Sequence, residues 1–416
     1  MSEVRWPMAP QQEYMLSNIQ FKSADPGLRF RNPFLALSIR GQLNVERFEA
    51  AVSVLVRRHS VLRAELDQTG RLSMRIRRVE EVNGFTFEDD CDDPTSVLAE
   101  EEWRRFDLTR APLWRVKVIR IDLEEYIVSL SFCHLIWDGI SMRTFLDLLA
   151  REYASYGCDK EPAQYEIFVN RAEQERMLRQ AGSVQSLTES PGISRARHER
   201  RDGGIEVSEI DVRRYTVSIG REKMGKIRAR AISSGTGPFV ALLSAYMIAA
   251  ASVFHRSSLV TAFATSRLDL RPAEDCLGYF SDLSVGVFLS DATAPGEARI
   301  QWVNRVPSWT EIQPSLGVTY PQEIWDFWAR GPVFSGALEW PDLLPKLRTC
   351  VLDLTPSSRM LVSNGLHRRV FGGQIIPAFI VDDLLEGIVH LEYNATALNR
   401  RVVMKLADQL CAEVDS

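Results

Sequence analysis

Two different hydrophobic periods meet in the stretch Ser131-Phe132-Cys133-His134-Leu135-Ile136-Trp137-Asp138-Gly139-Ile140-Ser141. Before the turn, residues 126–133 alternate large apolar and small side chains, which predicts a strand with two distinct faces. After it, residues 142–150 carry large apolar side chains at helical spacing, and Ser141 is suited to cap that helix. The stretch therefore predicts a strand–turn–helix unit of an α/β protein. His134 and Asp138 lie in the turn, where such folds often carry their chemistry.

The residue types in this turn suit acid–base chemistry. A histidine titrates near neutral pH, so His134 can accept a proton from an attacking amine or hydroxyl. Asp138 can hold the turn in shape by accepting hydrogen bonds or by pairing with an arginine. Gly139 tolerates backbone angles closed to other residues, which lets the chain bend into the helix. Taken alone, the pattern leaves open a histidine with only a structural role.

The segment Cys133–Gly139 resembles the His-His-x-x-x-Asp-Gly signature of the condensation domains of nonribosomal peptide synthetases. These domains belong to a superfamily of acyltransferases that resemble chloramphenicol acetyltransferase. Further stretches along nearly the whole chain are similar to other motifs of the family and follow in the same order: Met8–Glu13, Arg58–Arg63, Pro112–Arg115, Ser266–Arg267, Gly278–Leu283 and Leu391–Asn394.

The resemblance implies an α/β fold of two chloramphenicol acetyltransferase-like lobes. In the family these lobes form a V-shaped pseudo-dimer with a tunnel at the junction, and His134 would lie inside that tunnel. A change in composition at residues 180–209, where serine, glycine, arginine and glutamate dominate, predicts a linker. We therefore expect an N-terminal lobe at 1–179 that carries the signature, a linker at 180–209 and a C-terminal lobe at 210–416.

For function, the resemblance implies a free-standing condensation-domain acyltransferase of natural-product biosynthesis, such as antibiotic biosynthesis. The acyl donor would be a thioester on the phosphopantetheine of an acyl or peptidyl carrier protein, or on coenzyme A. The acceptor would be a small-molecule amine or alcohol, and the product an amide or ester. No metal and no cofactor are implied. The chain has no Gly-Gly-x-Ser carrier site, no adenylate-forming motif and no Gly-x-Ser-x-Gly elbow, so we expect it to act on acyl groups that another molecule presents.

The resemblance also assigns roles to residues of the turn. His134 is the expected catalytic residue, and Gly139 is expected to support the turn. Arg267 ends a predicted buried strand and needs a partner, because an unpaired interior charge is strongly destabilising. The family pattern makes Asp138 that partner, so that Asp138 braces the site and does not act as the base.

Four further residues are candidates for the substrate pocket, each with an alternative. Trp137 either lies beside a flat substrate or packs in the core. Arg63 lies either near the pocket or on an ordinary strand surface. Asn364 either donates a hydrogen bond to a carbonyl oxygen or forms an Asn-Gly turn. Cys133 stands where the family has its first histidine, and a packing role is favoured over a thiol nucleophile because adjacent strand residues point to opposite faces.

Two departures from the family pattern favour an alternative function. Cys133 replaces the first histidine, and Asp282 replaces the asparagine of the Gly-x-Phe-x-Asn motif. Both suit a catalytically degenerate domain that recruits a partner to an assembly line, whereas the intact His134, Asp138 and Gly139 favour the enzyme. An epimerase of the same fold would need an additional acid–base residue, which the sequence does not reveal. A heterocyclisation domain would need an aspartate in place of His134.

Composition excludes several other classes. The 416 residues are 45% hydrophobic, which is enough for a large core, and the net charge of -5 gives no basic surface for nucleic acid. Met1–Pro10 is too polar for a signal peptide, and the most apolar run, Pro238–Phe254, is shorter than the roughly 20 residues that cross a bilayer. Six cysteines without a Cys-x-x-Cys pair favour reduced thiols and no zinc site. We expect a cytoplasmic protein with no membrane or nucleic-acid partner.

Hydrophobic periodicity predicts the remaining elements. Helices are expected at 45–58, 238–254 and 399–414, and a hairpin of strands at 62–66 and 72–76. Residues 152–179 are expected to be mostly helical. Further strands are expected at 34–39, 114–121, 214–219, 259–265, 278–289, 369–380 and 384–393.

Overall fold

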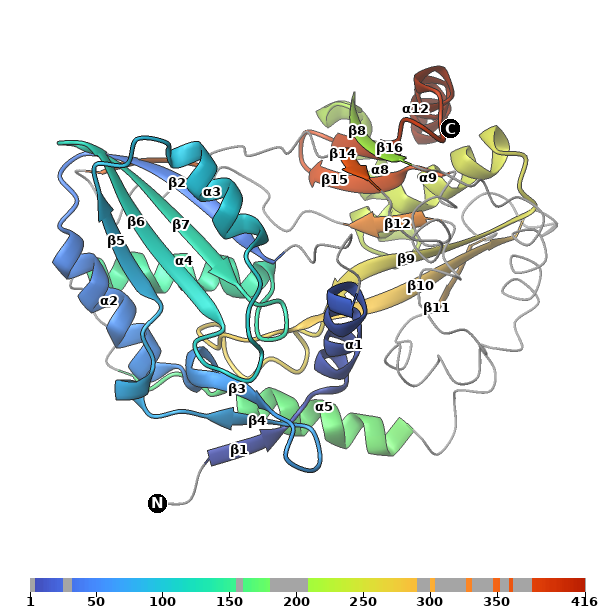
Figure 1. Ribbon diagram of the computed structural model, residues 1–416. Coiled ribbons are helices and arrows are strands. Elements are labelled where there is room, and N and C mark those ends of the chain that lie inside the picture. The colour runs from blue at the N-terminus through green and yellow to red at the C-terminus, as the bar shows by residue number, and fades with distance from the viewer. Residues whose placement is uncertain are drawn as a thin grey trace. The chain divides into compact units, whose positions relative to one another are not determined.

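The computed structural model describes residues 4–24, 32–154, 160–179, 209–289, 300–303, 327–330, 347–351, 359–361 and 376–415. These residues form helices and strands in mixed order, as the α/β prediction requires (Figure 1). The chain divides into two compact units. The first unit comprises Met1–Leu178, Arg267–Ser281 and Gly336–Thr355, and the second unit comprises Arg179–Ser266, Asp282–Ser335 and Pro356–Ser416.

These units differ from the predicted lobes, which are continuous stretches at 1–179 and 210–416. Arg267–Ser281 belongs to the first unit, because several of its side chains are buried in that unit's core: Cys276, Leu277, Tyr279 and Phe280. Strand β13 (Arg348–Val351) also belongs there, since it pairs antiparallel with β2 (Phe34–Arg40). Contacts with residues far away in sequence place both Arg267–Ser281 and β13 in the first unit. Local composition cannot predict such contacts.

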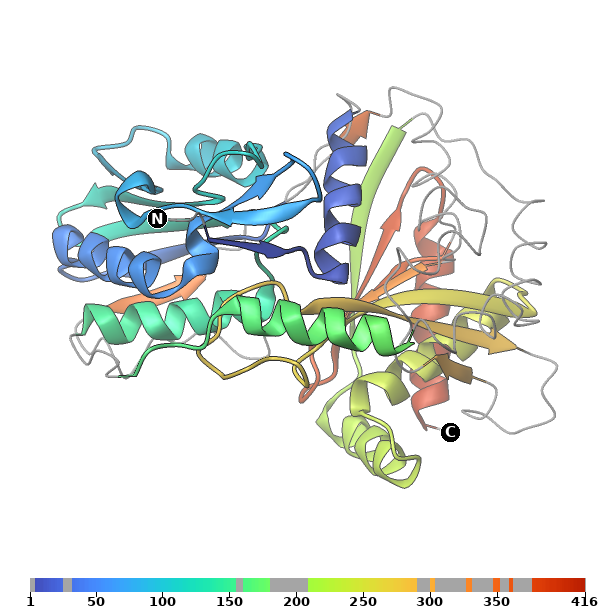
Figure 2. The same ribbon diagram turned by 90° about the horizontal axis from the view of Figure 1, so that it is seen from below.

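The main element of the first unit is a five-stranded sheet in the order β13-β2-β7-β6-β5. Strands β6 (Trp114–Asp122) and β7 (Glu125–Phe132) pair antiparallel, and β5 (Phe85–Asp89) lies parallel to β6 at the edge. The predicted strands for β2, β6 and β7 are confirmed to within one residue. Helices α2 (Val45–Arg58) and α4 (Gly139–Tyr153) pack together on one face of the sheet, and α3 (Pro94–Trp103) lies on the other (Figures 1 and 2).

Helix α2 confirms the prediction for 45–58 and shows why its sequence is helical. Asn44 caps it, because its side-chain oxygen accepts the Arg47 N–H at 2.9 Å, and the apolar stripe that includes Phe48 and Leu55 is buried. The prediction that residues 152–179 are mostly helical is confirmed, and the helical residues belong to two helices. Helix α4 ends at Tyr153, and a separate helix, α5 (Tyr165–Arg179), starts after Pro162, which cannot donate a helical hydrogen bond.

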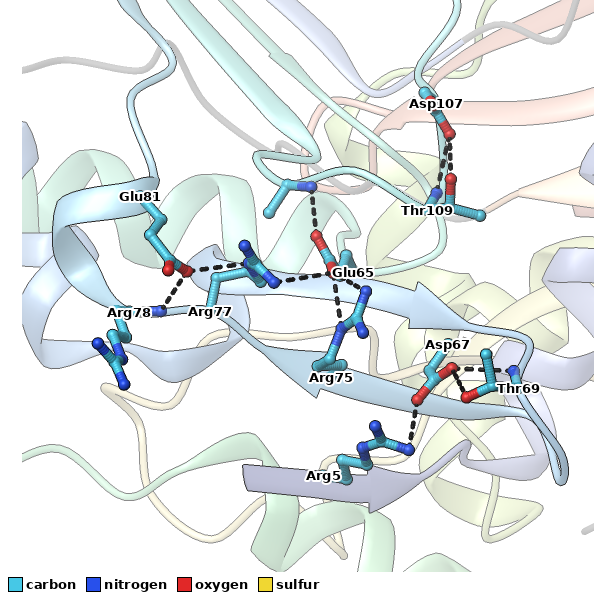
Figure 3. Close-up of polar contacts among 11 residues, drawn as sticks. Arg5, Glu65, Asp67, Thr69, Arg75, Arg77, Arg78, Glu81, Asp107 and Thr109 are labelled. Carbon is cyan, nitrogen blue, oxygen red and sulfur yellow. Dashed lines mark hydrogen bonds and ion pairs between the residues drawn. The ribbon is translucent and has the colours of Figure 1, made fainter. Parts of the chain in front are cut away.

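A smaller sheet in the order β1-β4-β3 completes the first unit, together with α1 (Pro10–Ala24). Its strands are β1 (Val4–Pro7), β3 (Ala64–Asp67) and β4 (Ser73–Ile76), so the predicted hairpin is confirmed, but Ser60–Arg63 form a 3-10 turn. Buried carboxylates join the strands (Figure 3). Glu65 accepts hydrogen bonds from Arg75 of β4 at 2.8 Å and from the Ala111 amide at 2.9 Å. Asp67 pairs with Arg5 of β1 at 2.7 Å, so neither buried charge lacks a partner.

The second unit is built on an eight-stranded sheet in the order β11-β10-β9-β12-β15-β16-β8-β14. Its strands are β8 (Glu209–Ser218), β9 (Ser258–Ser266), β10 (Ser281–Leu289), β11 (Ile300–Val303), β12 (Phe327–Arg330), β14 (Arg359–Leu361), β15 (Ala378–Asp383) and β16 (Ile388–Asn394). Most of the predicted linker, residues 180–208, lies outside the described residues, and Glu209 already begins β8. The strand predicted at 278–289 starts at Ser281, because residues 278–280 belong to the first unit and their main chain is bonded to Tyr165 and Asp138.

Among the described residues, three helices pack with the second sheet: α8 (Arg221–Ser233), α9 (Pro238–Val253) and α12 (Arg400–Asp415). Helix α9 confirms the predicted buried helix, and its first residue, Pro238, occupies a position where the missing N–H costs nothing. Within the described ranges no single helix is long and apolar enough to span a membrane. Only α8 and α9 taken together pass such a test, and a bend of 105° separates them.

Candidate active site

Residues 133–138 form the turn between β7 and α4, here called the signature turn, and most of its side chains are buried. Phe132, Leu135, Ile136 and Trp137 are fully buried, whereas His134 is only half-buried. Burial of its neighbours fixes the turn by packing. Within residues 133–138, His134 is therefore the residue whose side chain remains partly accessible.

A main-chain hydrogen bond sets the tautomer of this imidazole. Nδ1 of His134 lies 2.7 Å from the carbonyl oxygen of Trp137, three residues along the same turn. Because a carbonyl oxygen has no hydrogen to give, Nδ1 must carry the proton. The neutral ring then has its lone pair on Nε2, which is the arrangement that a general base requires.

Asp138 caps helix α4 and ties it to a distant segment. Its Oδ1 accepts the Ser141 N–H at 2.9 Å, and its backbone is extended, with φ -140° and ψ -175°, as expected for an N-cap. Its Oδ2 accepts the Phe280 N–H at 2.8 Å and the Ser281 hydroxyl at 3.1 Å. Burial raises the pKa of the Asp138 carboxyl, and these donors oppose the rise. Gly139 is the first residue of the helix, directly after the cap.

The predicted ion pair between Asp138 and Arg267 is wrong. Arg267 instead binds Glu175 of α5 and lies 2.9 Å from Asp269 in its own loop. The physical reason is that backbone N–H groups and hydroxyls already serve the buried carboxylate, so no guanidinium is needed to offset its charge. Asp138 is a brace of the site, as predicted, but with different partners.

Arg271 is an arginine on which the charge of Asp138 acts. Burial lowers the pKa of its guanidinium, and the charge of Asp138 is among those that oppose this effect. The Arg271 guanidinium donates to the Cys276 carbonyl at 2.8 Å and to the Thr144 hydroxyl of α4 at 2.9 Å, and it lies over the Phe280 ring. Arg271 therefore joins the loop before Phe280 to the helix that follows the signature turn.

The segment Gly278–Ser281 is held against the signature turn by further side chains. The Ser141 hydroxyl donates to the Gly278 carbonyl at 2.6 Å and accepts the Gly278 N–H at 2.8 Å. The Tyr165 hydroxyl donates to the Tyr279 carbonyl at 2.7 Å, and burial raises the pKa of Tyr165 well above its ordinary value, so this donor keeps its proton. Only glycine fits at position 278, since an added Cβ would lie 1.9 Å from the Tyr165 ring.

The opening motif contributes Gln12, at the start of helix α1. Its buried side-chain amide donates to the Leu135 carbonyl at 2.9 Å, while its oxygen accepts the Ala9 N–H at 3.1 Å. Leu135 directly follows His134. The amide therefore satisfies a buried carbonyl in the signature turn that would otherwise have no partner among the described residues.

Two pocket candidates lie in the core. Trp137 is fully buried and stacks on Phe132, with centroids 3.9 Å apart, so its predicted contact with a substrate is wrong and its packing alternative holds. Cys133 is 1% exposed, its N–H bonds the Leu113 carbonyl at 2.8 Å, and burial raises the pKa of its thiol to about 12. A thiol of that kind is neither accessible nor nucleophilic at neutral pH. The side chains of Cys133 and Trp137 are both enclosed, because each packs in the core at one end of the turn.

The remaining two pocket candidates are Arg63 and Asn364. Arg63 is half-buried and donates to the Arg77 carbonyl at 3.1 Å, at the end of the small sheet. Burial lowers the pKa of its guanidinium. Asn364 lies outside the described residues. Across the ranges that the structure describes, no group of histidine, cysteine, aspartate or glutamate side chains is arranged to hold a metal ion.

The sequence did not predict the site contacts of four side chains: Gln12, Ser141 in its bond to Gly278, Tyr165 and Arg271. Gln12 and Gly278 lie in stretches that resemble family motifs, and this resemblance could have indicated that both residues belong to the site. Tyr165 and Arg271 lie in no quoted motif, and nothing in the sequence alone points to their contacts.

Known proteins resemble this chain in sequence and in fold. A family model described as "Condensation domain" matches residues 10–280. Gramicidin S synthase 2 of Brevibacillus brevis is 24% identical over 287 residues, which cover 66% of this chain and 6% of that protein. Tyrocidine synthase 3 of Brevibacillus parabrevis is 26% identical over 256 residues, covering 58% of this chain and 4% of that protein. The chain therefore spans only a small part of the length of these relatives.

Solved structures share the fold at low identity. The X-domain from teicoplanin biosynthesis has a TM-score of 0.68 and 19% identity, covering 100% of this chain and 95% of that one. The same values of TM-score and identity hold for the X-domain in its complex with OxyB, of which 93% is covered. The condensation domain of the monacolin K polyketide synthase MokA has a TM-score of 0.67 and 12% identity, covering 97% of that chain.

The fold is thus that of the acyltransferases that resemble chloramphenicol acetyltransferase, with a half-buried histidine in the turn after a central strand. The chain belongs to the condensation domain family. Membership in this family supports a role in the condensation step of nonribosomal peptide synthesis or in a related step.

Proposed function

We propose that this chain is an acyltransferase that joins a thioester-bound acyl group to an amine or hydroxyl, forming an amide or ester. The observation that carries the proposal is the His134 Nδ1 bond to the Trp137 carbonyl, because it leaves the lone pair of the neutral ring on Nε2. The donor thioester would be carried by the phosphopantetheine of a carrier protein or by coenzyme A. The acceptor would be a small-molecule amine or alcohol.

The reaction follows from this assignment. The acceptor nitrogen or oxygen attacks the thioester carbonyl carbon while Nε2 of His134 takes its proton. The carbonyl π electrons move to the oxygen and form a tetrahedral oxyanion. When the carbonyl re-forms, the carbon–sulfur bond breaks and the thiolate takes the proton back from Nε2. The ring ends in the tautomer in which it began, and no redox partner is required.

The test compares product formation by wild type and by His134→Ala. Each is incubated with an acyl-carrier thioester, or with the matching acyl-coenzyme A, and a panel of amines and alcohols, and product is followed by mass spectrometry. Loss of a general base lowers the rate by roughly 10²–10⁴-fold. His255→Asn is the matched control, because His255 is exposed and its φ of 52° is a conformation that asparagine tolerates. Equal yields from wild type and His134→Ala above background would contradict the proposal.

A second candidate is a domain that recruits a partner protein and transfers nothing. The specific observation in its favour is the buried Cys133 at the place of the first histidine of the family signature. The fold likeness to the X-domain, whose structure is also known in complex with OxyB, makes partner binding a reasonable second function. Absence of product for wild type with every donor and acceptor pair would favour this candidate.

A further inference from the structure

Tyr279 has a fixed main chain and a ring that faces the imidazole. Its neighbours Gly278 and Phe280 are bonded to Ser141 and Asp138, and its own carbonyl accepts the Tyr165 hydroxyl. None of these bonds uses the Tyr279 side chain. Hydrogen bonds to the main chain of residues 278–280 therefore hold the main chain at position 279.

The ring of Tyr279 is 4% exposed and packs against His134. The two ring centroids are 5.5 Å apart and their planes meet at 85°, the edge-to-face arrangement that aromatic rings favour. The torsion that turns an imidazole about its Cβ–Cγ bond is broad and poorly fixed by rotamer preference alone. A hydrogen bond at Nδ1 and a wall against the ring together define the plane in which Nε2 lies.

We propose that Tyr279 is a positioning residue for the imidazole of His134, and that Tyr165 acts through it. This inference rests on the proposed acyl transfer. Transfer depends on the direction of the Nε2 lone pair, because a displacement of about 1 Å at a reacting group can cost roughly 10²-fold in rate. Tyr279 supplies the ring contact that holds this direction, and the Tyr165 hydroxyl holds the Tyr279 carbonyl.

The first test removes the ring and keeps the main chain. Tyr279→Leu should lower kcat by roughly 10- to 100-fold, with KM for the thioester within about threefold of wild type. Tyr279→Phe keeps the ring and should recover most of that loss. Tyr126→Leu removes another buried tyrosine of the same unit, at the far end of β7, and should lower stability without changing kcat. A Tyr279→Leu enzyme with wild-type kcat would overturn the inference.

The second test needs no turnover. In protein labelled with ¹⁵N-histidine, the ring nitrogens of His134 should give the pattern of a single Nδ1–H tautomer, assigned with His134→Ala. Tyr279→Leu should shift these signals toward averaged values, whereas Tyr126→Leu should leave them unchanged. Unchanged His134 signals in Tyr279→Leu would also overturn the inference. If wild type transfers no acyl group, the proposed function fails, and this measurement still decides whether Tyr279 positions the ring.

The third test asks whether Tyr165 acts through Tyr279. Tyr165→Phe removes the donor to the Tyr279 carbonyl and should lower kcat in the wild-type background. In the Tyr279→Leu background the same change should lower kcat by less than about twofold, because the contact that it supports is already gone. Full additivity of the two changes would show that Tyr165 acts by another route.

Discussion

The carboxylate of Asp138 accepts the main-chain N–H of Phe280 at 2.8 Å across 142 residues of sequence. Its other oxygen accepts the Ser141 N–H at the start of α4. One side chain therefore caps the helix after the signature turn and binds the segment that carries Tyr279. The turn, the helix and the segment are held as one unit because a carboxylate accepts on both oxygens.

Replacing Asp138 by asparagine should remove one of its two main-chain hydrogen bonds, either the bond to Ser141 or the bond to Phe280. The amide has a single acceptor oxygen, so its NH₂ group must face either the Ser141 or the Phe280 N–H. We expect Asp138→Asn to lower the free energy of unfolding by about 1–3 kcal/mol, the cost of a buried donor left unpaired, as measured by urea denaturation. We also expect it to lower kcat.

Asp93→Asn is the matched control. Asp93 caps α3 in the same way, by accepting the Ser96 N–H at 3.1 Å, but it is exposed and reaches no distant segment. Asparagine is as good an N-cap as aspartate, so little change is expected there. If both variants lost the same stability, the bond from Asp138 to Phe280 would contribute nothing.

Gly278 and Gly225 should respond to alanine in opposite directions. At Gly278 the added methyl would overlap the Tyr165 ring, and overpacking of this kind costs about 1–3 kcal/mol. Gly225 is exposed on α8 with nothing within 4 Å of the new Cβ, so alanine should stabilise the helix by about 1 kcal/mol. Thermal unfolding of the two variants measures both changes. Unchanged stability of Gly278→Ala would contradict a close contact between residue 278 and the Tyr165 ring.

The buried His59 should make stability fall in mild acid. Burial, with a smaller effect of Arg58, lowers the pKa of His59 from 6.5 to about 4. Between these two pKa values the imidazole of His59 is protonated in the unfolded chain and neutral in the folded chain. The free energy of unfolding therefore rises with pH across that window, and the contribution is fully present above pH 6.5. The loss on acidification to pH 4 should be about 3 kcal/mol.

Urea denaturation of wild type and of His59→Leu from pH 4 to pH 7 measures this contribution. The variant has no imidazole at this position, so its stability should depend less on pH within the window. His255→Asn, which removes an exposed histidine, should keep the wild-type slope. An equal slope in wild type and His59→Leu would assign the acid sensitivity to other groups.

The thiol of Cys133 should be inert in the folded protein. Its pKa of about 12 leaves almost no thiolate at pH 8, and it is 1% exposed. Iodoacetamide should therefore leave Cys133 unmodified in the native protein and modify it after unfolding in urea, as seen by peptide mass spectrometry. Cys133→Ala should lower stability by about 1 kcal/mol and retain activity per folded molecule. A loss of activity by roughly 100-fold would reveal a chemical role.

The sequence predicted the elements whose information is local. The helix at 45–58 has an N-cap and an apolar stripe, and β6 and β7 each begin with alternating burial, so these boundaries were confirmed to within a residue or two. The strand–turn–helix unit with His134 and Asp138 in its turn was also confirmed, but the helix is capped by Asp138 and not by Ser141, the residue expected as its cap.

The partners of the site residues were beyond local information. The prediction that Arg267 pairs with Asp138 followed the family pattern, yet a buried carboxylate can be served equally well by amides and hydroxyls, which carry no sequence signature. The side of the turn on which Trp137 lies depends on its stacking with Phe132, and the period of the strand does not specify it. Tyr165 and Arg271 reach the site only through contacts that folding creates.

The acceptor of the His134 Nδ1 proton is a peptide carbonyl, and every amino acid at position 137 supplies one. In many enzymes a carboxylate side chain orients the histidine, and a single mutation can delete it. Here the protonation pattern of the ring is encoded in chain geometry, so mutations at 137 can alter packing and stability without reversing which nitrogen is basic. Changes that bend the peptide plane of the turn, and not changes of side-chain chemistry at 137, are the ones to which this histidine is vulnerable.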